Sequence, residues 1–187
     1  LNLGTAAFSG VIGGDTCTIV TGGSTGTFSD QHVGTGKTVT IVGIGKTGAD
    51  SGNYSITQPT TTANITKRPI TVTAAADSKV YDATTSSGAA PTITSGTLAG
   101  DDTASWAQTY DNKNVGTNKI LTVTPASVSD GNAGGNYSVT YATNSTGAIT
   151  QKALTVLNVT AQNKEYDDTN TATLNLGTAA FSGVIGG

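Results

Sequence analysis

The chain has 187 residues, a formal net charge of −3 at pH 7 and 11% charged residues, against about 25% in an ordinary soluble domain. Its only adjacent basic pair is Lys67 and Arg68, so it lacks the positive surface that nucleic-acid binding needs. The apolar runs are only a few residues long, and we therefore expect no membrane insertion in this segment.

Short segments that alternate apolar and hydroxyl-bearing residues recur along the chain and predict strands. Clusters of Gly, Asn, Asp and Ser lie between them and supply turns. No window of a dozen residues has a helical period, so the predicted fold class is all-β. In chain order the predicted strands are KTVTIVGI (37–44), PITVTAA (69–75), KILTVTPA (119–126), NYSVTYA (136–142) and KALTVLNV (152–159).

The sequence LNLGTAAFSGVIGG occurs at residues 1–14 and again at 174–187, which gives a period of 173 residues. That length is too great for one supersecondary unit, and a shorter, degenerate repeat lies inside it. The inner copies keep the same order along the chain. They are SGNYSIT (51–57) with GGNYSVT (134–140), HVGTGKTVTI (32–41) with NVGTNKILTV (114–123), and SKVYDATT (78–85) with NKEYDDTN (163–170).

Each period is therefore interpreted as a pair of homologous domains. Residues 1–68 form the body of one repeat without its first strand, and residues 69–152 form a complete repeat of the other type. Residues 153–187 begin the next repeat of the first type. The candidates for the cores are the strand Val, Ile and Leu residues, the tyrosines, Trp106, Phe28 and either Phe8 or Phe181.

The motifs follow one another in a fixed order: Tyr-Asp, then Val-Gly with a following Lys, then Gly-Asn-Tyr, then Ile-Thr before the next strand. This order resembles the YDG domain repeats of large secreted bacterial adhesins of the filamentous-haemagglutinin type. The Gly of the name motif is Ala83 in one copy and Asp168 in the other. If that Gly has a positive φ in the family, we expect the turn to be built differently here.

The recurring motif residues are interpreted as structural rather than catalytic. In Tyr81–Asp82 and Tyr166–Asp167, Tyr is expected to bury its ring and hydrogen-bond its hydroxyl, while Asp accepts backbone N–H groups of the turn. We expect no His, Glu or Lys partner at a matching place in both copies. In the Gly-Asn-Tyr motifs, Gly and Asn turn the chain and Tyr starts a strand. The other predicted structural residues are Gly34, Gly52, Asn53, Tyr54, Gly116, Gly135, Asn136 and Tyr137.

The residues that catalysis or metal binding would need are scarce. His32, Cys17 and Glu165 are the only residues of their kinds, and none is near another in a motif. An enzyme is therefore not expected, and neither is a cofactor. Asp50 and Asp130 lie among Asn residues and carbonyl groups, which Ca²⁺ prefers as ligands. Because neither stretch supplies several carboxylates, turns are the favoured interpretation and Ca²⁺ the weaker one.

The repeats and the weakly charged, Thr- and Gly-rich composition favour an extracellular structural role. We expect small β-sandwich domains of the Ig-like type, arranged in tandem as an elongated rod. Such a rod would serve as the stalk of a surface adhesin, secreted by a Gram-negative bacterium and associated with its outer membrane. The expected partners are neighbouring repeats of the same chain or identical subunits. Two alternatives stay open: a module that binds a glycan or protein, and a filament subunit completed by intermolecular strand addition.

Overall fold

The computed structural model describes residues 2–186, and these residues contain no α-helix, which confirms the all-β fold class. No helix in this part of the chain is long and apolar enough to cross a membrane. All five predicted strands are present, with ends that differ by a few residues. They are β3 (Gly34–Val42), β6 (Arg68–Thr73), β10 (Gly116–Thr124), β11 (Tyr137–Ala142) and β13 (Thr155–Leu157).

The chain divides into two compact units, which are described separately. The first consists of Leu1–Arg68 with Ser129–Ser138, and the second consists of Pro69–Val128 with Val139–Gly187. In the first unit, β3 is the central strand of an antiparallel sheet with β2 (Thr25–Phe28) and β5 (Thr60–Ile65) on either side.

A second, smaller ladder completes the strands of the first unit. In it, β1 (Thr18–Val20) pairs with β4 (Gly45–Thr47), and a single 3-10 turn, η1 (Ser51–Asn53), follows β4.

Alternation along β3 decides which side chains of the first unit are buried. Val39 and Ile41 are 6% and 5% exposed, whereas Val42, on the opposite face of the strand, is 49% exposed. Successive side chains of a strand point to opposite faces, so period two places the apolar residues on one side. Ile44, just after the strand, is also buried. Phe28 and Phe8, which were expected in the core, are half-buried.

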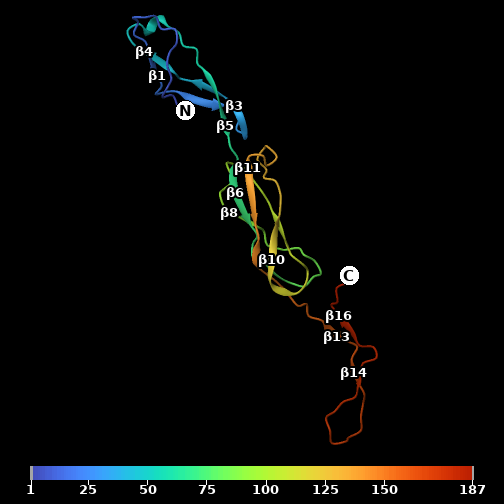
Figure 1. Ribbon diagram of the computed structural model, residues 1–187. Coiled ribbons are helices and arrows are strands. Elements are labelled where there is room, and N and C mark those ends of the chain that lie inside the picture. Colours follow the sequence, from blue (N-terminus) through green and yellow to red (C-terminus); the bar gives the residue numbers. More distant parts are fainter. Residues whose placement is uncertain (1, 187) are drawn as a thin grey trace. The chain divides into compact units, whose positions relative to one another are not determined.

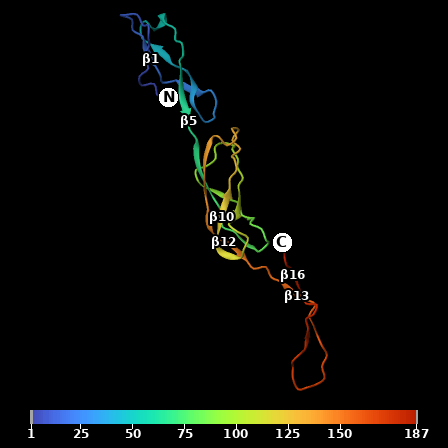
Figure 2. The same cartoon turned by 45° about the vertical axis from the view of Figure 1, so that its right-hand side comes forward.

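The second unit contains a four-stranded and a three-stranded sheet (Figure 1). The first has the order β7-β12-β10-β9, with β7 (Ser78–Val80) parallel to β12 (Asn144–Thr150) and the other pairs antiparallel. β9 spans Ala107–Tyr110. β10 and β12 run side by side in two views (Figures 1 and 2).

The three-stranded sheet of the second unit has the order β11-β6-β8, where β8 spans Thr92–Ser95. Its central strand buries Ile70 (2% exposed) and Val72 (0%). Strands of the four-stranded sheet contribute Leu121 (0%) and Ile149 (1%) to the buried set, and Trp106 is 8% exposed. Apolar residues from both sheets therefore supply the core of this unit.

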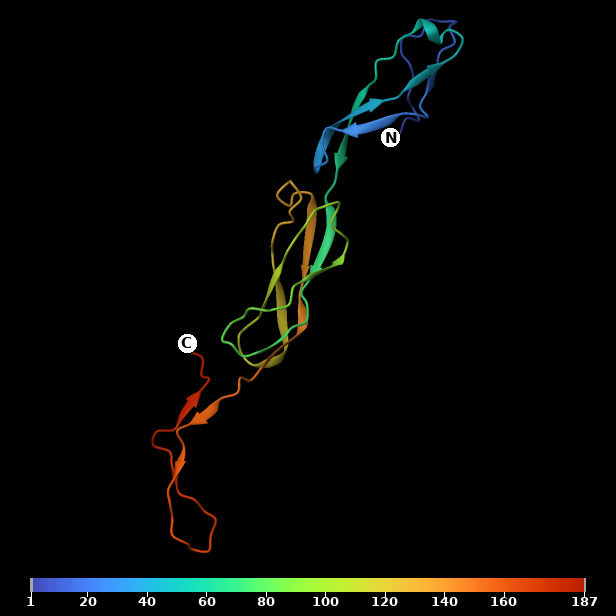
Figure 3. The same cartoon turned by 180° about the vertical axis from the view of Figure 1, so that it is seen from behind.

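The end of the chain forms only short ladders. β13 pairs with β16 (Ala180–Ser182), and β14 (Thr160–Ala161) pairs with β15 (Leu174–Asn175). The rest of this segment is open loop, as the view from behind shows (Figure 3). The expectation that Phe181 belongs to a core is wrong, because Phe181 is 65% exposed. A two-stranded ladder covers one edge of a strand but buries neither of its faces.

Replacing Leu121 by Ala is expected to lower the free energy of unfolding of the second unit by about 2–5 kcal/mol, since the side chain is fully buried and its loss leaves a cavity. Ile120, the next residue of β10, is 45% exposed and is the matched control. Ile120→Ala should lower the free energy of unfolding clearly less than Leu121→Ala does. Urea unfolding followed by Trp106 fluorescence measures both, and equal effects would contradict the assignment of the core.

Candidate functional site

The Tyr-Asp motif follows β7, whose parallel pairing with β12 fixes where the turn begins. The Tyr81 N–H continues that pairing by donating to the Thr150 carbonyl at 2.9 Å. The chain then turns, and Oδ1 of Asp82 accepts both the N–H and the hydroxyl of Thr84 at 2.9 Å. Such short-range bonds are typical of an Asx turn, in which a side-chain oxygen replaces a backbone acceptor.

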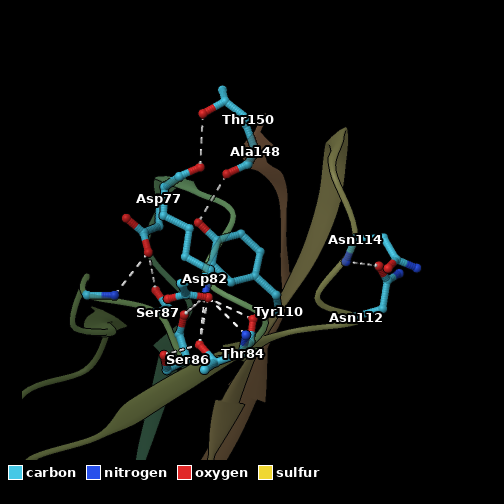
Figure 4. A network of polar contacts seen from close by, with 12 residues as sticks. Asp77, Asp82, Thr84, Ser86, Ser87, Tyr110, Asn112, Asn114, Ala148 and Thr150 are labelled. Atoms are coloured by element: carbon cyan, nitrogen blue, oxygen red, sulfur yellow. Dashed lines mark hydrogen bonds and ion pairs between the residues drawn. The ribbon is translucent and has the colours of Figure 1, made fainter. Parts of the chain in front are cut away.

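The Lys79 ammonium lies at the centre of this turn. Its Nζ is 2.8 Å from Asp82 Oδ1, 2.9 Å and 3.0 Å from the carbonyl and hydroxyl oxygens of Thr84, and 2.8 Å from the Ser86 carbonyl. Asp82, Thr84 and Ser86 converge on one point in Figure 4. The ammonium is also 5.4 Å from the centre of the Tyr110 ring, within cation–π range. One cation thus closes the turn.

The second copy of the motif forms the same turn. Lys164 Nζ is 2.7 Å from Asp167 Oδ1 and donates to the carbonyl and hydroxyl of Thr169 at 2.9 and 2.8 Å. The Thr169 N–H again donates to the carboxylate, at 3.1 Å. The expectation that no Lys recurs at a matching place is therefore wrong. The signal was present in the sequence, since Lys precedes Asp by three residues in both copies.

The residue after the motif Asp has a left-handed backbone in both copies. Ala83 has φ +63° and Asp168 has φ +56°. The turn is therefore not rebuilt to avoid a positive φ, contrary to the expectation from the missing Gly. Instead, the Lys–Asp–Thr bonds hold a non-Gly residue in a conformation that costs an L-residue roughly 1–2 kcal/mol.

The two motif tyrosines differ in burial. Tyr81 is half-buried and lines a cavity of about 430 Å³ with Val115, Leu154 and Val184. Tyr166 is 90% exposed, and its hydroxyl donates to Asp168 Oδ1 at 3.0 Å. The expected burial of the ring is therefore wrong for Tyr166, because its segment has formed the turn but has no sheet packed over it.

The two Gly-Asn-Tyr motifs also differ. After Gly135 and Asn136, Tyr137 begins β11 and is 4% exposed, as expected. After Gly52 and Asn53 of η1, Tyr54 is half-buried but no strand follows it through residue 59, so that part of the expectation is wrong.

The hydroxyl of Tyr54 instead fastens an N-terminal loop of the first unit. It donates to Asp15 Oδ2 at 2.7 Å and accepts the Ile12 N–H at 3.0 Å. The two glycines of the Val-Gly elements, Gly34 and Gly116, are the first residues of β3 and β10.

The two aspartates considered for calcium accept protein N–H groups. Asp130 is 6% exposed, and its carboxylate accepts the N–H groups of Asn132 and Gly134 at 2.8 Å and of Asn136 at 2.9 Å. Asp50 Oδ2 accepts the Thr16 N–H at 2.8 Å. The Asp130 carboxylate therefore holds its own turn together, whereas that of Asp50 joins the start of η1 to the segment before β1. Within residues 2–186 there is no group of three or more His, Cys, Asp or Glu residues arranged to hold a metal ion.

Asn136 ties the segment 129–138 to other residues of the first unit. Its Oδ1 accepts the Val33 N–H at 2.9 Å, and its Nδ2 is 3.2 Å from His32 Nδ1. Its carbonyl accepts the Arg68 N–H at 2.9 Å. Asn136 was predicted as a turn residue only, because contacts across about a hundred residues leave no periodic signal in the sequence.

Sequence reasoning missed a buried polar cluster in the second unit. Gln108, 2% exposed, donates to the carbonyl of Ala75 and to Ser87 Oγ, each at 2.9 Å, and its Oε1 accepts the Ala75 N–H at 2.7 Å. Asp77 accepts the Ser87 hydroxyl at 2.6 Å. Burial, together with the charge of Asp77, raises the pKa of Tyr110 to about 12. Of these groups, Asp77, Ser87 and Tyr110 lie beside the turn of Asp82 and Thr84 in Figure 4.

Small sheets with mostly antiparallel pairing, together with one lysine-centred turn built twice along the chain, define an all-β repeat protein. The model of the YDG domain family matches residues 2–63 and 66–146. The chain therefore belongs to the YDG domain family. Neither a search of curated proteins nor a search of solved structures found a match.

Ala83→Gly is expected to stabilise the second unit by on the order of 0.5 kcal/mol. Relief of the left-handed strain gives roughly 1–2 kcal/mol, and the greater freedom of Gly in the unfolded chain offsets about 0.5–1 kcal/mol of that gain. Thermal unfolding measures the difference. Ala107→Gly, at an exposed position of β9, is the matched control and should destabilise. If both substitutions lower the melting temperature alike, the turn does not carry the strain described.

The stability of the second unit is expected to fall between about pH 4 and pH 2. The Lys79 ammonium and the Thr84 N–H and hydroxyl lower the pKa of Asp82 from 3.8 to about 2. Because the folded state favours the charged carboxylate, its contribution is complete above the unfolded pKa and is lost as the pH falls through the folded value. Melting temperatures at pH 6, 4, 3 and 2 should therefore decline less for Asp82→Asn than for the parent. Parallel curves would contradict the role of the ion pair.

Proposed function

We propose that the chain is a structural segment of a large extracellular bacterial surface protein, in which YDG repeats act as a stalk or spacer. The observation that carries the proposal is the repetition itself. The turn of Lys79 and Asp82 recurs at Lys164 and Asp167 with the same ion pair, and fourteen residues recur unchanged after 173 positions. Repetition of this kind suits a function that depends on length.

The connections between repeats support a stiff array. Only Thr66 and Lys67 separate the end of β5 from the start of β6, and Pro69 fixes one φ angle in β6 itself. Four residues separate the end of β12 from the start of β13. Connections this short have little of the freedom of a Gly/Ser-rich linker. We therefore propose that each repeat forms a small Ig-like sandwich and that successive repeats form an elongated rod.

The weakly charged surface fits a protein that projects from a cell or links cells rather than one that binds a charged ligand. Attachment to the outer membrane of a Gram-negative bacterium and participation in adhesion belong to the same proposal. Its support is the membership of the YDG family and the Thr- and Gly-rich composition.

Small-angle X-ray scattering of a chain carrying two periods tests the proposed stalk. When residues 1–173 are repeated once before the final fourteen residues, the maximum dimension should nearly double relative to the parent. The cross-sectional radius should stay constant. A compact particle, or the profile of flexibly linked domains, would contradict the proposal.

A further inference from the structure

A buried lysine in β10 lies against an amide and a carboxylate of the preceding loop. Lys119 is 6% exposed and lies on the same face of the strand as the buried Leu121, whereas Ile120 between them is 45% exposed. The Lys119 Nζ is 2.6 Å from Asn112 Oδ1 and 3.1 Å from Asp111 Oδ1. A buried ammonium is costly unless it is paired. The second unit thus holds an amine, a carboxamide and a carboxylate in mutual contact.

The contacts around Asn112 supply the parts of an acyl-transfer site. Its Oδ1 accepts the Asn114 N–H at 3.0 Å, as the dashed line between them in Figure 4 shows, in addition to the lysine ammonium. This backbone N–H would stabilise negative charge on the oxygen during attack at Cγ. The Asn112 Nδ2 donates to Asp111 Oδ2 at 3.2 Å. One carboxylate therefore touches both the amine and the nitrogen that would leave.

We propose that Lys119 and Asn112 react with each other to form an isopeptide bond, an amide between two side chains, with Asp111 moving the protons. The Asp111 carboxylate takes one proton from the Lys119 ammonium, and the resulting amine attacks Asn112 Cγ. The carboxyl group then passes its proton to Nδ2 and takes a second proton from the attacking nitrogen. The Cγ–Nδ2 bond breaks, and ammonia leaves with that proton as ammonium. An amide between Nζ and Cγ remains, and Asp111 is a carboxylate again.

The reaction needs no other reagent and takes place once per chain. The hydrogen bond from the Lys119 ammonium lowers the pKa of Asp111, so the charged pair is the major form and the neutral pair that reacts is the minor one. Bond formation is therefore slow. The released ammonium escapes to solvent, because the Asp111 side chain is 38% exposed. The product also replaces a buried charge by a neutral amide, which removes a desolvation cost.

The first unit contains the same lysine without the amide and the second acid. Lys37, the counterpart of Lys119, forms an ion pair with Asp30. The Asp30 carboxylate also accepts the His32 N–H at 2.8 Å, so the loop has the same local geometry. A carboxylate thus replaces the amide, and Ser29 takes the position of the Asp that moves the protons. This site should stay an ion pair, and the chain should contain one isopeptide bond.

The bond goes beyond the proposed structural role and does not depend on it. β10 lies between β12 and β9 in the four-stranded sheet, and the bond would tie the loop of residues 112–118 to this strand. A covalent link does not open when hydrogen bonds break, and Cys17 is the only cysteine, so no disulfide within the chain does this work. The chemistry is tested by mass and the stalk by shape, so either can fail alone.

The intact mass of the full, denatured chain tests the proposal after the folded protein has been kept at neutral pH for days. The mass should lie about 17 Da below the value calculated from the sequence, because one ammonia is lost. Trypsin cleaves after Lys113 but should not cleave after the acylated Lys119. Residues 80–113 and 114–152 should therefore remain joined after digestion.

Three variants assign the bond to its residues. Lys119→Arg keeps the positive charge but removes the nucleophilic amine, and Asp111→Asn removes the group that moves the protons. Both should have the masses calculated from their sequences. Lys37→Arg, the matched control in the first unit, should keep the deficit of about 17 Da.

Four results would overturn the isopeptide bond. They are a parent chain of full mass, a deficit that persists in Lys119→Arg, a deficit that disappears in Lys37→Arg, and a deficit in a parent whose two tryptic peptides separate. The last result would mean that an Asn side chain has lost ammonia by cyclising onto the backbone. A deficit that persists in Asp111→Asn would overturn the role given to that carboxylate.

Discussion

The repeat depends on a central strand that is hydrogen-bonded along both edges. In residues 69–152 this strand is β6, which lies between β11 and β8 and buries Val72 completely. Where such a strand is present, the Tyr after Gly-Asn starts a strand and is buried, as Tyr137 shows. In the first unit no described strand takes this place, and the segment after Tyr54 stays unpaired. One pairing thus decides whether flanking segments become strands.

The lysine-centred turn behaves differently because its bonds are local. Lys164, Asp167 and Thr169 form it in an exposed segment. Lys164 there makes the bonds to the motif Asp and Thr that Lys79 makes in a well-packed unit. Bonds that span only a few residues need little tertiary support, whereas burial of the tyrosine ring needs a neighbouring sheet. The turn is therefore formed even where no sheet packs over it.

Period-two alternation was sufficient to predict the strands and the all-β class, because it reports which side chains share a face. It does not report whether a partner strand is present, and for this reason the predictions for Phe181, Tyr166 and the segment after Tyr54 were wrong. The lysine of the turn was visible as a constant spacing in both copies but carries no apolar signal. Gln108 and Asn136 act through long-range bonds, which a single sequence does not encode in any local pattern.

Hydrogen exchange measured by mass spectrometry shows whether the doubly paired central strand holds the repeat together. The amides of β6, which lies between β11 and β8, should exchange slowly, whereas those of residues 55–57, which belong to no strand, should exchange fast. Exchange of the β6 amides as fast as that of residues 55–57 would contradict the dependence of the repeat on this strand.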